Sequence, residues 1–135
     1  MAEAIDQIIT WMPALLIATR TTLLLTVFSV CSALVLSVFL ALGKISRNPI
    51  ISKLCTAYIF FFRGTPLLIQ LFIVYFGLPL INPAFDVGNL PFANTEYFLT
   101  HPRFIAAYIA FTLNIAAYLA EIIRDRKSTR LNSSH

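Results

Sequence analysis

The side chains that could do chemistry in this chain are few, and they lie inside or beside long apolar runs. Arg63, Gln70 and Asn114 interrupt otherwise apolar stretches, and Glu121 and Arg124 follow at the end of the last one. Polar groups are costly in lipid, so they predict contacts between helices or the lining of a polar route. The sequence has no zinc-ligand spacing and no glycine-rich phosphate loop. We therefore expect no catalytic residue, no metal and no cofactor.

The stretch Arg63-Gly64-Thr65-Pro66 predicts a kink or break in a helix. Pro66 has no backbone N–H and clashes with the carbonyl group of Phe62, and Gly64 loosens the same turn. Carbonyl groups freed at membrane depth must face protein or a water-filled cavity. The alternative is a structural kink beside an arginine whose charge reaches the membrane surface.

Gln70 lies seven residues after Arg63, which predicts that both occupy one helical face. Gln70 and Asn114 allow two readings. Buried amides in membrane helices usually form hydrogen bonds between helices, each worth about 0.6–2 kcal/mol. The second reading is that Arg63, Gln70 and Asn114 line a substrate pathway. Glu121 and Arg124 are three residues apart and predict a local ion pair.

Composition indicates a membrane protein. The 135 residues are 59% hydrophobic and 12% charged, about half the charged fraction of a soluble domain. No charged residue lies between Thr21 and Leu42, and a run of about 22 residues can cross a hydrocarbon core of ~30 Å. The acidic N-terminus excludes a signal peptide. We interpret Cys31 and Cys55 as packing residues.

We expect an all-α membrane protein with three transmembrane helices, over about 21–42, 54–77 and 104–123, preceded by an N-terminal amphipathic helix within 1–19. Small side chains at four-residue steps mark the packing face of the first spanning helix: Ser29, Ala33, Ser37 and Ala41. The third spanning helix has a similar small and polar face: Ala106, Ala110, Asn114, Ala117 and Glu121.

Charge sets the expected orientation. The loop 43–53 contains Lys44, Arg47 and Lys53 and no acidic residue, so we expect it in the cytoplasm. The acidic N-terminus and the proline-rich loop 78–103 are then outside. The net charge of +4 therefore concerns topology, and we expect no nucleic-acid partner.

Three regions follow from these patterns. We expect 1–19 to be an N-terminal amphipathic segment on the outer side of the membrane, 20–124 a transmembrane domain and 125–135 a tail. The tail, DRKSTRLNSSH, begins where the apolar pattern stops and resembles a translated sequencing adapter. We expect it to be non-native and give it no function. A native basic cytoplasmic tail is the alternative.

Two strings resemble one protein family. The string from Phe61 to Phe72, followed by Tyr75-Phe76-Gly77, resembles the signature of the polar amino-acid ABC transporter permeases of the histidine, glutamine, arginine and opine type. The string from Leu113 to Arg124 resembles the third helix of the same family. The similarity covers about 14–124.

The resemblance implies part of a type I ABC importer permease domain in the bacterial inner membrane, with a periplasmic N-terminus. Members have about five spanning helices, pair as homo- or heterodimers, and work with a periplasmic binding protein and ATP-hydrolysing subunits. It implies a polar or basic substrate, arginine or histidine, and places Glu121 and Arg124 at the start of the ATPase-coupling segment. The family pattern continues past Arg124, so we expect a chain truncated before the EAA coupling loop that does not transport by itself.

Two other functions remain open at this stage. One is a small three-helix membrane scaffold or interaction protein. The other is a channel-like pore built by oligomerisation, for which Arg63 is the one candidate lining charge.

Overall fold

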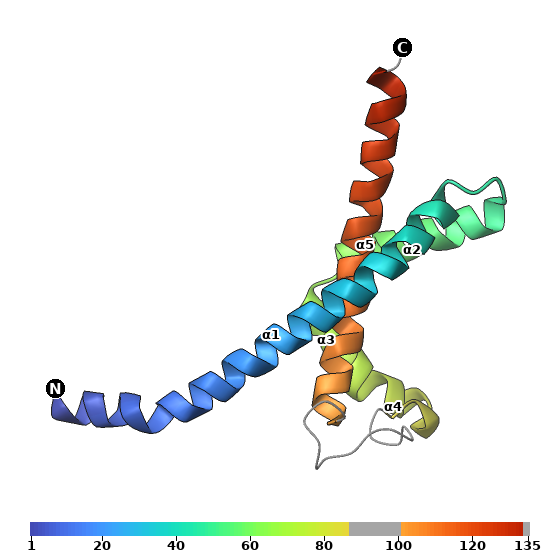
Figure 1. The fold of residues 1–135 in the computed structure, drawn as a ribbon. Coiled ribbons are helices and arrows are strands. Elements are labelled where there is room, and N and C mark those ends of the chain that lie inside the picture. Colours follow the sequence, from blue (N-terminus) through green and yellow to red (C-terminus); the bar gives the residue numbers. More distant parts are fainter. Residues whose placement is uncertain (87–100, 134–135) are drawn as a thin grey trace.

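The computed structural model describes residues 1–86 and 101–133, and the secondary-structure elements in this part are all helices or helical turns joined by short loops (Figure 1). Most of the predicted loop 78–103 and the last two residues of the tail lie outside the described residues. The expected all-α fold is confirmed. Its elements are α1 (Ala2–Lys44), α2 (Pro49–Gly64), α3 (Leu67–Phe72), the π-helical turn η1 (Ile73–Gly77), α4 (Leu78–Ile81), the 3₁₀ turn η2 (Pro83–Phe85) and α5 (Pro102–Ser133).

Helix α1 joins two segments that the sequence analysis treats separately. Its 43 residues span about 65 Å, roughly twice the thickness of a hydrocarbon core. Pro13 lies inside this helix, and a proline bends a helix because one backbone hydrogen bond is missing. Figure 1 shows the first turns of α1 at an angle to the remainder. Residues 1–20 are all exposed, so the interfacial role of 1–19 stays a prediction.

The small-residue face of α1 is the face that the structure buries. The buried residues of α1 are the four predicted ones: Ser29, Ala33, Ser37 and Ala41. They meet α5, which crosses α1 (Figure 1). The fully buried residues of α5 are also small: Ala106, Ala110, Ala116, Ala117 and Ala120. Small side chains let the two backbones approach closely, which favours association where lipid removes the hydrophobic drive.

One polar contact supplements the packing of α1 on α5. The hydroxyl groups of Ser32 and Tyr108 form a hydrogen bond between the two helices. The sequence analysis missed this pair, because the two residues are 76 positions apart and nothing local connects them.

Helix α2 begins earlier than the predicted start at Leu54. The side chain of Asn48 accepts a hydrogen bond from the Ile50 N–H at 3.0 Å, and Pro49 is the first helical residue. An asparagine cap followed by proline is a favourable helix start, because proline lacks the N–H that would be unpaired there. The Ser52 hydroxyl donates to the Lys44 carbonyl at 2.7 Å and ties α2 to the end of α1.

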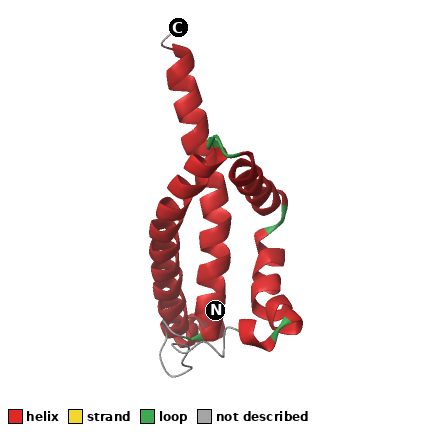
Figure 2. Ribbon diagram, turned by 90° about the vertical axis from the view of Figure 1, so that its right-hand side faces the viewer, coloured by secondary structure: helices red, strands yellow, loops and turns green. Residues whose placement is uncertain are grey.

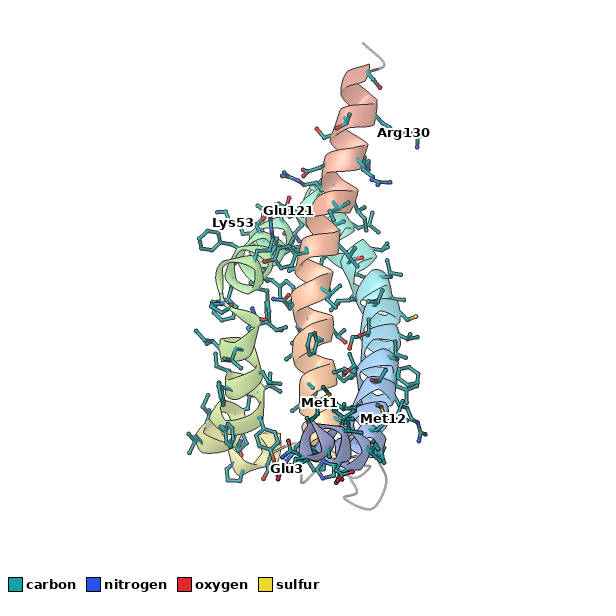
Figure 3. All side chains as sticks on the ribbon, turned by 90° about the vertical axis from the view of Figure 1, so that its left-hand side faces the viewer. Met1, Glu3, Met12, Lys53, Glu121 and Arg130 are labelled. Carbon is teal, nitrogen blue, oxygen red and sulfur yellow. The ribbon has the colours of Figure 1, made fainter. Side chains whose placement is uncertain are left out.

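The described residues contain two or three candidate spanning segments. Helices α1 and α5 are long and apolar enough to cross a membrane, and α2 with α3–α4 forms a third span if its two bent arms count as one. In Figure 2 the loops between the helices lie at the two ends of the bundle and at the break after α2. Figure 3 shows α3–α4 and α1 on opposite sides of α5.

Helix α5 does not end at Ile123 as predicted. It continues to Ser133, and the side chains from Ile122 to Arg130 are exposed. The structure has no change of secondary structure at the boundary predicted after Arg124. The division into regions and the foreign origin of 125–135 stay predictions.

Candidate functional site

The predicted break in the second spanning segment is present at Thr65–Pro66. Helix α2 ends at Gly64, Thr65 and Pro66 are extended, with ψ of 141° and 139°, and the arms on either side meet at a bend of 109°. The missing N–H of Pro66 and its clash with the preceding turn favour a break here. Gly64 keeps helical geometry, and a Cβ there would meet nothing within 4 Å. Its part is to lower helix propensity at the end of α2.

The break leaves the Phe62 carbonyl without its helical partner, and two side-chain amides replace that partner. Gln70 Nε2 donates to Phe62 O at 2.9 Å, and Asn114 Nδ2 donates to the same oxygen at 3.2 Å. Asn114 Nδ2 also lies 3.1 Å from Gln70 Oε1. A buried carbonyl without a hydrogen bond is costly in lipid, so these bonds stabilise the broken backbone. We call Phe62, Gln70 and Asn114 the amide cluster.

Gln70 also pairs with the residue at the break itself. Its Nε2 lies 3.1 Å from Thr65 O and 2.7 Å from Thr65 Oγ1, and the residue is 2% exposed. Asn114 is half-buried on α5. Its Oδ1 accepts no hydrogen bond from the described residues. Within the described residues, Asn114 Oδ1 is therefore a side-chain acceptor of the amide cluster that no donor occupies.

The prediction that Arg63 and Gln70 share one helical face is wrong. A seven-residue spacing aligns side chains only along an unbroken helix, and here the two residues stand on different arms, α2 and α3. The Arg63 guanidinium carbon lies 5.5 Å from the centre of the Tyr118 ring, a cation–π distance. The Tyr118 hydroxyl lies 3.4 Å from the Arg63 carbonyl oxygen.

Glu121 forms ion pairs with Lys44 and Arg124 at the end of the bundle, and we call these three residues the charge cluster. The predicted pair with Arg124 is confirmed, with Arg124 Nε 3.3 Å from Glu121 Oε2. The other carboxylate oxygen pairs with Lys44, the last residue of α1. Glu121 is 8% exposed, so the pair with Lys44 is screened less than a surface pair. The sequence analysis assigned Lys44 only to the basic loop and missed this contact.

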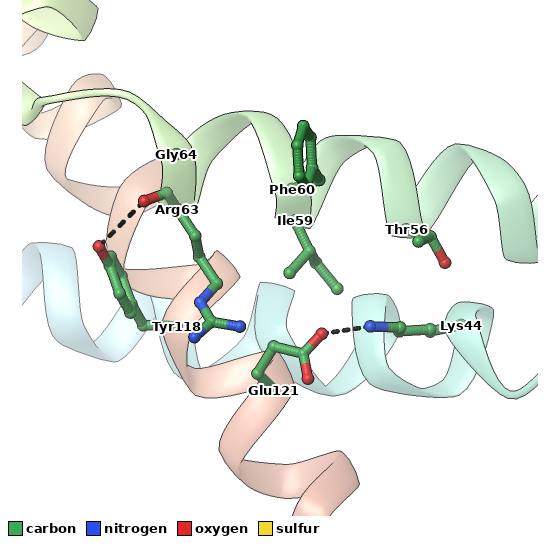
Figure 4. Close-up of a pocket in the computed structure, with 8 residues that line it drawn as sticks. All are labelled: Lys44, Thr56, Ile59, Phe60, Arg63, Gly64, Tyr118 and Glu121. Atoms are coloured by element: carbon green, nitrogen blue, oxygen red, sulfur yellow. Dashed lines mark hydrogen bonds and ion pairs between the residues drawn. The ribbon is translucent and has the colours of Figure 1, made fainter.

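A pocket of about 420 Å³ lies at the charge cluster, with Lys44 and Glu121 in its wall. Figure 4 shows the Arg63 side chain, with Tyr118 beside it, and the Glu121–Lys44 pair within this pocket. Its wall residues come from α1, α2 and α5: Lys44, Thr56, Ile59, Phe60, Arg63, Gly64, Tyr118 and Glu121. Tyr58, just outside it, donates to the Leu113 carbonyl at 2.7 Å. Tyr118 and Tyr58 gave no signal in the sequence, because aromatic residues are common throughout these helices.

Metal ligands do not gather in the described part of the chain, where no three histidine, cysteine, aspartate or glutamate residues form a group that could hold an ion. The two cysteines, Cys31 and Cys55, are both free. The polar groups brought together are amides, a guanidinium, an ammonium and a carboxylate. Such groups can bind and orient a polar solute.

These features define a class: a helical membrane protein whose second span is broken, with side-chain amides at the break and a charge cluster at the end of the bundle. Over the part of their length that it covers, the chain is similar in sequence and fold to amino-acid ABC transporter permeases. It is 42% identical over 113 residues to the probable amino-acid ABC transporter permease PatM of Vibrio harveyi, covering 84% of this chain and 45% of the relative. It is 39% identical over 120 residues to the nopaline transport system permease NocM of Agrobacterium fabrum, covering 89% and 47%.

A solved structure agrees with these relatives. The crystal structure of an amino acid ABC transporter with histidines superposes with a TM-score of 0.70 at 32% identity, over 88% of this chain and 48% of the other. No family model matches the chain. The chain spans about half the length of the curated relatives it matches.

Proposed function

We propose that this chain forms the membrane-spanning substrate route of a permease subunit in an ATP-driven importer of polar amino acids. The broken span with its amide cluster supports this role most directly. It puts hydrogen-bonding groups where a plain helix would present only apolar side chains. The similarity to amino-acid ABC transporter permeases supports the same class.

The substrate that we propose is a basic amino acid, arginine or histidine. Asn114 Oδ1, which has no donor among the described residues, can accept a hydrogen bond from a guanidinium, imidazole or ammonium group. Arg63, before the break, and Gln70, after it, are the further pathway candidates. The neighbouring structure, which was solved with histidines, supports a substrate of this kind.

The partners that we propose are those of a complete importer. A binding protein outside the membrane delivers the amino acid, and a second permease subunit completes the route. ATP-hydrolysing subunits in the cytoplasm dock beyond Glu121 and Arg124. The permease itself then hydrolyses nothing.

We propose a location in the bacterial inner membrane with the N-terminus in the periplasm. The support is the basic loop with Lys44, Arg47 and Lys53, set against the acidic Glu3 and Asp6 at the other end of α1. Single cysteines at Glu3 and Ser46, in a background without the native cysteines, test this orientation. A membrane-impermeant maleimide should label position 3 in whole cells and position 46 only after lysis. The opposite pattern excludes the proposed orientation.

Uptake by the complete transporter that contains this sequence tests the function. Cells without their own basic amino-acid importers should gain ATP-dependent uptake of labelled arginine or histidine when they express it with its binding protein and ATPase. Unlabelled basic amino acids should compete better than acidic or aliphatic ones. Failure to import any polar amino acid would favour the alternative, a membrane scaffold.

A further inference from the structure

The Arg63 guanidinium in the pocket has no anionic partner among the residues that the structure describes. Its carbon lies 5.5 Å from the centre of the Tyr118 ring, and none of the ion pairs within 1–86 and 101–133 includes it. A guanidinium stacked on a ring keeps its N–H donors at the edge of its plane. These donors are therefore available to a ligand.

The charge balance of the pocket favours an anion. The pocket contains two cations, Arg63 and Lys44, and one carboxylate, that of Glu121. The Glu121 carboxylate is already shared between Lys44 and Arg124. Its repulsion of a second anion is thereby reduced, and the charge of Arg63 is left uncompensated.

The surroundings of the pocket indicate which anion fits. One wall is apolar and comes from Ile59 and Phe60. Phe60 is 80% exposed, so this wall offers an apolar surface to acyl chains. Figure 3 shows Lys53, from the basic loop, at the same end of the bundle as Glu121. Cations beside an apolar wall at one membrane surface match the headgroup and acyl chains of a lipid.

We propose that this pocket binds the phosphate headgroup of an anionic phospholipid through the Arg63 guanidinium. The flat guanidinium can donate two parallel hydrogen bonds to phosphate oxygens. Tyr118 orients the guanidinium, and Thr56 adds a hydroxyl group to the pocket wall. This site gives Arg63 a different role from the pathway role proposed above, and it does not depend on the rest of the proposed transport function.

Lipid adducts measured by native mass spectrometry test this site. The purified chain is exposed to equal amounts of phosphatidylglycerol and phosphatidylcholine, and the ratio of the two bound lipids is determined. Arg63→Gln should lower the phosphatidylglycerol preference about fivefold, the effect of one surface cation on anionic lipid. Arg47→Gln, which removes a charge from the loop outside the pocket, is the matched control and should retain the preference. Equal losses in both variants overturn the proposal, because they indicate a diffuse attraction to the basic end.

A second variant keeps the test decisive if Arg63→Gln does not fold. Tyr118→Leu keeps every charge and removes the ring that orients the guanidinium, so the preference should fall about two- to fivefold. Unchanged lipid preference in Tyr118→Leu overturns the assignment of Arg63. Inorganic phosphate separates the lipid from a free anion. Loss of the preference with phosphate, but not with chloride at equal ionic strength, assigns the pocket to free phosphate and overturns the lipid proposal.

Discussion

Gln70 and Asn114, 44 residues apart in sequence, donate their side-chain amides to one and the same oxygen, the carbonyl of Phe62. That carbonyl is the one whose helical partner Pro66 cannot supply, because proline has no N–H. The contact joins α2, α3 and α5 at a single point. It therefore explains how a break can persist in a segment that is otherwise apolar.

Removing one amide donor should destabilise the bundle. We expect Asn114→Ala to lower the free energy of unfolding by about 1–2 kcal/mol, since the Phe62 carbonyl and the Gln70 oxygen each lose a donor. Unfolding by denaturing detergent in bicelles measures the change. Thr112→Val is the matched control, because the Thr112 hydroxyl is buried without a hydrogen-bond partner among the described residues. The interpretation fails if the two variants are equally stable.

Pro66 should maintain the angle between the two arms. In Pro66→Ala the backbone regains an N–H, and we expect α2 and α3 to straighten from the bend of 109°. Spin labels at Ile51 and Leu80, both exposed, report the change as a longer distance in pulsed electron paramagnetic resonance. Pro79→Ala removes a proline from α4 and should leave the distance unchanged. An unaltered distance in Pro66→Ala would show that the amide cluster alone holds the bend.

How much the sequence predicts depends on how local the cause is. The buried stripe from Ser29 to Ala41 follows from a four-residue repeat within one helix, and the break follows from Pro66 itself. The prediction that Arg63 and Gln70 share one helical face is wrong because the break at Pro66 interrupts the helical register between them. The predicted start of α2 is late because the loop 43–53 is defined by its charges, and the helix cap at Asn48 lies within it.

Contacts between distant segments were beyond the sequence analysis. Lys44 and Glu121 are 77 residues apart, and a basic residue at a helix end is equally compatible with a solvated charge. Asn114 was identified as a polar residue in a spanning helix, but its partner, a backbone carbonyl, leaves no mark in the sequence. Both contacts, Lys44 with Glu121 and Asn114 with the Phe62 carbonyl, depend on how α1, α2 and α5 pack.

The small stripe of α1 should not tolerate a large side chain. Ala33 is fully buried, and we expect Ala33→Leu to lower the free energy of unfolding by about 1–3 kcal/mol because α1 and α5 must separate to admit it. The same unfolding assay measures the loss. Val35→Leu, at a position that is 62% exposed, is the control and should be nearly neutral. Equal stability of both variants would contradict the packing of α1 on α5.

The pair between Lys44 and Glu121 should be energetically coupled. A double-mutant cycle with Lys44→Gln and Glu121→Gln should give a coupling energy of about 1 kcal/mol, because both side chains are largely buried. The pair Arg124–Asp125 is a control, since its side chains are 42% and 65% exposed and surface pairs are weakly coupled. A coupling energy no larger than that of the control pair would contradict the ion pair with Lys44 and leave Arg124 as the partner of Glu121.

The Michaelis constant for uptake by the complete transporter tests most directly whether the amide cluster lies on the substrate route. Asn114→Ala removes the free Oδ1 acceptor, and we expect the KM for arginine or histidine to rise about tenfold, the equivalent of one lost hydrogen bond. Rates are referred to the amount of folded transporter, and Thr112→Val should keep the original KM. A KM in Asn114→Ala equal to that of Thr112→Val would contradict the proposed route and leave the cluster a purely structural support.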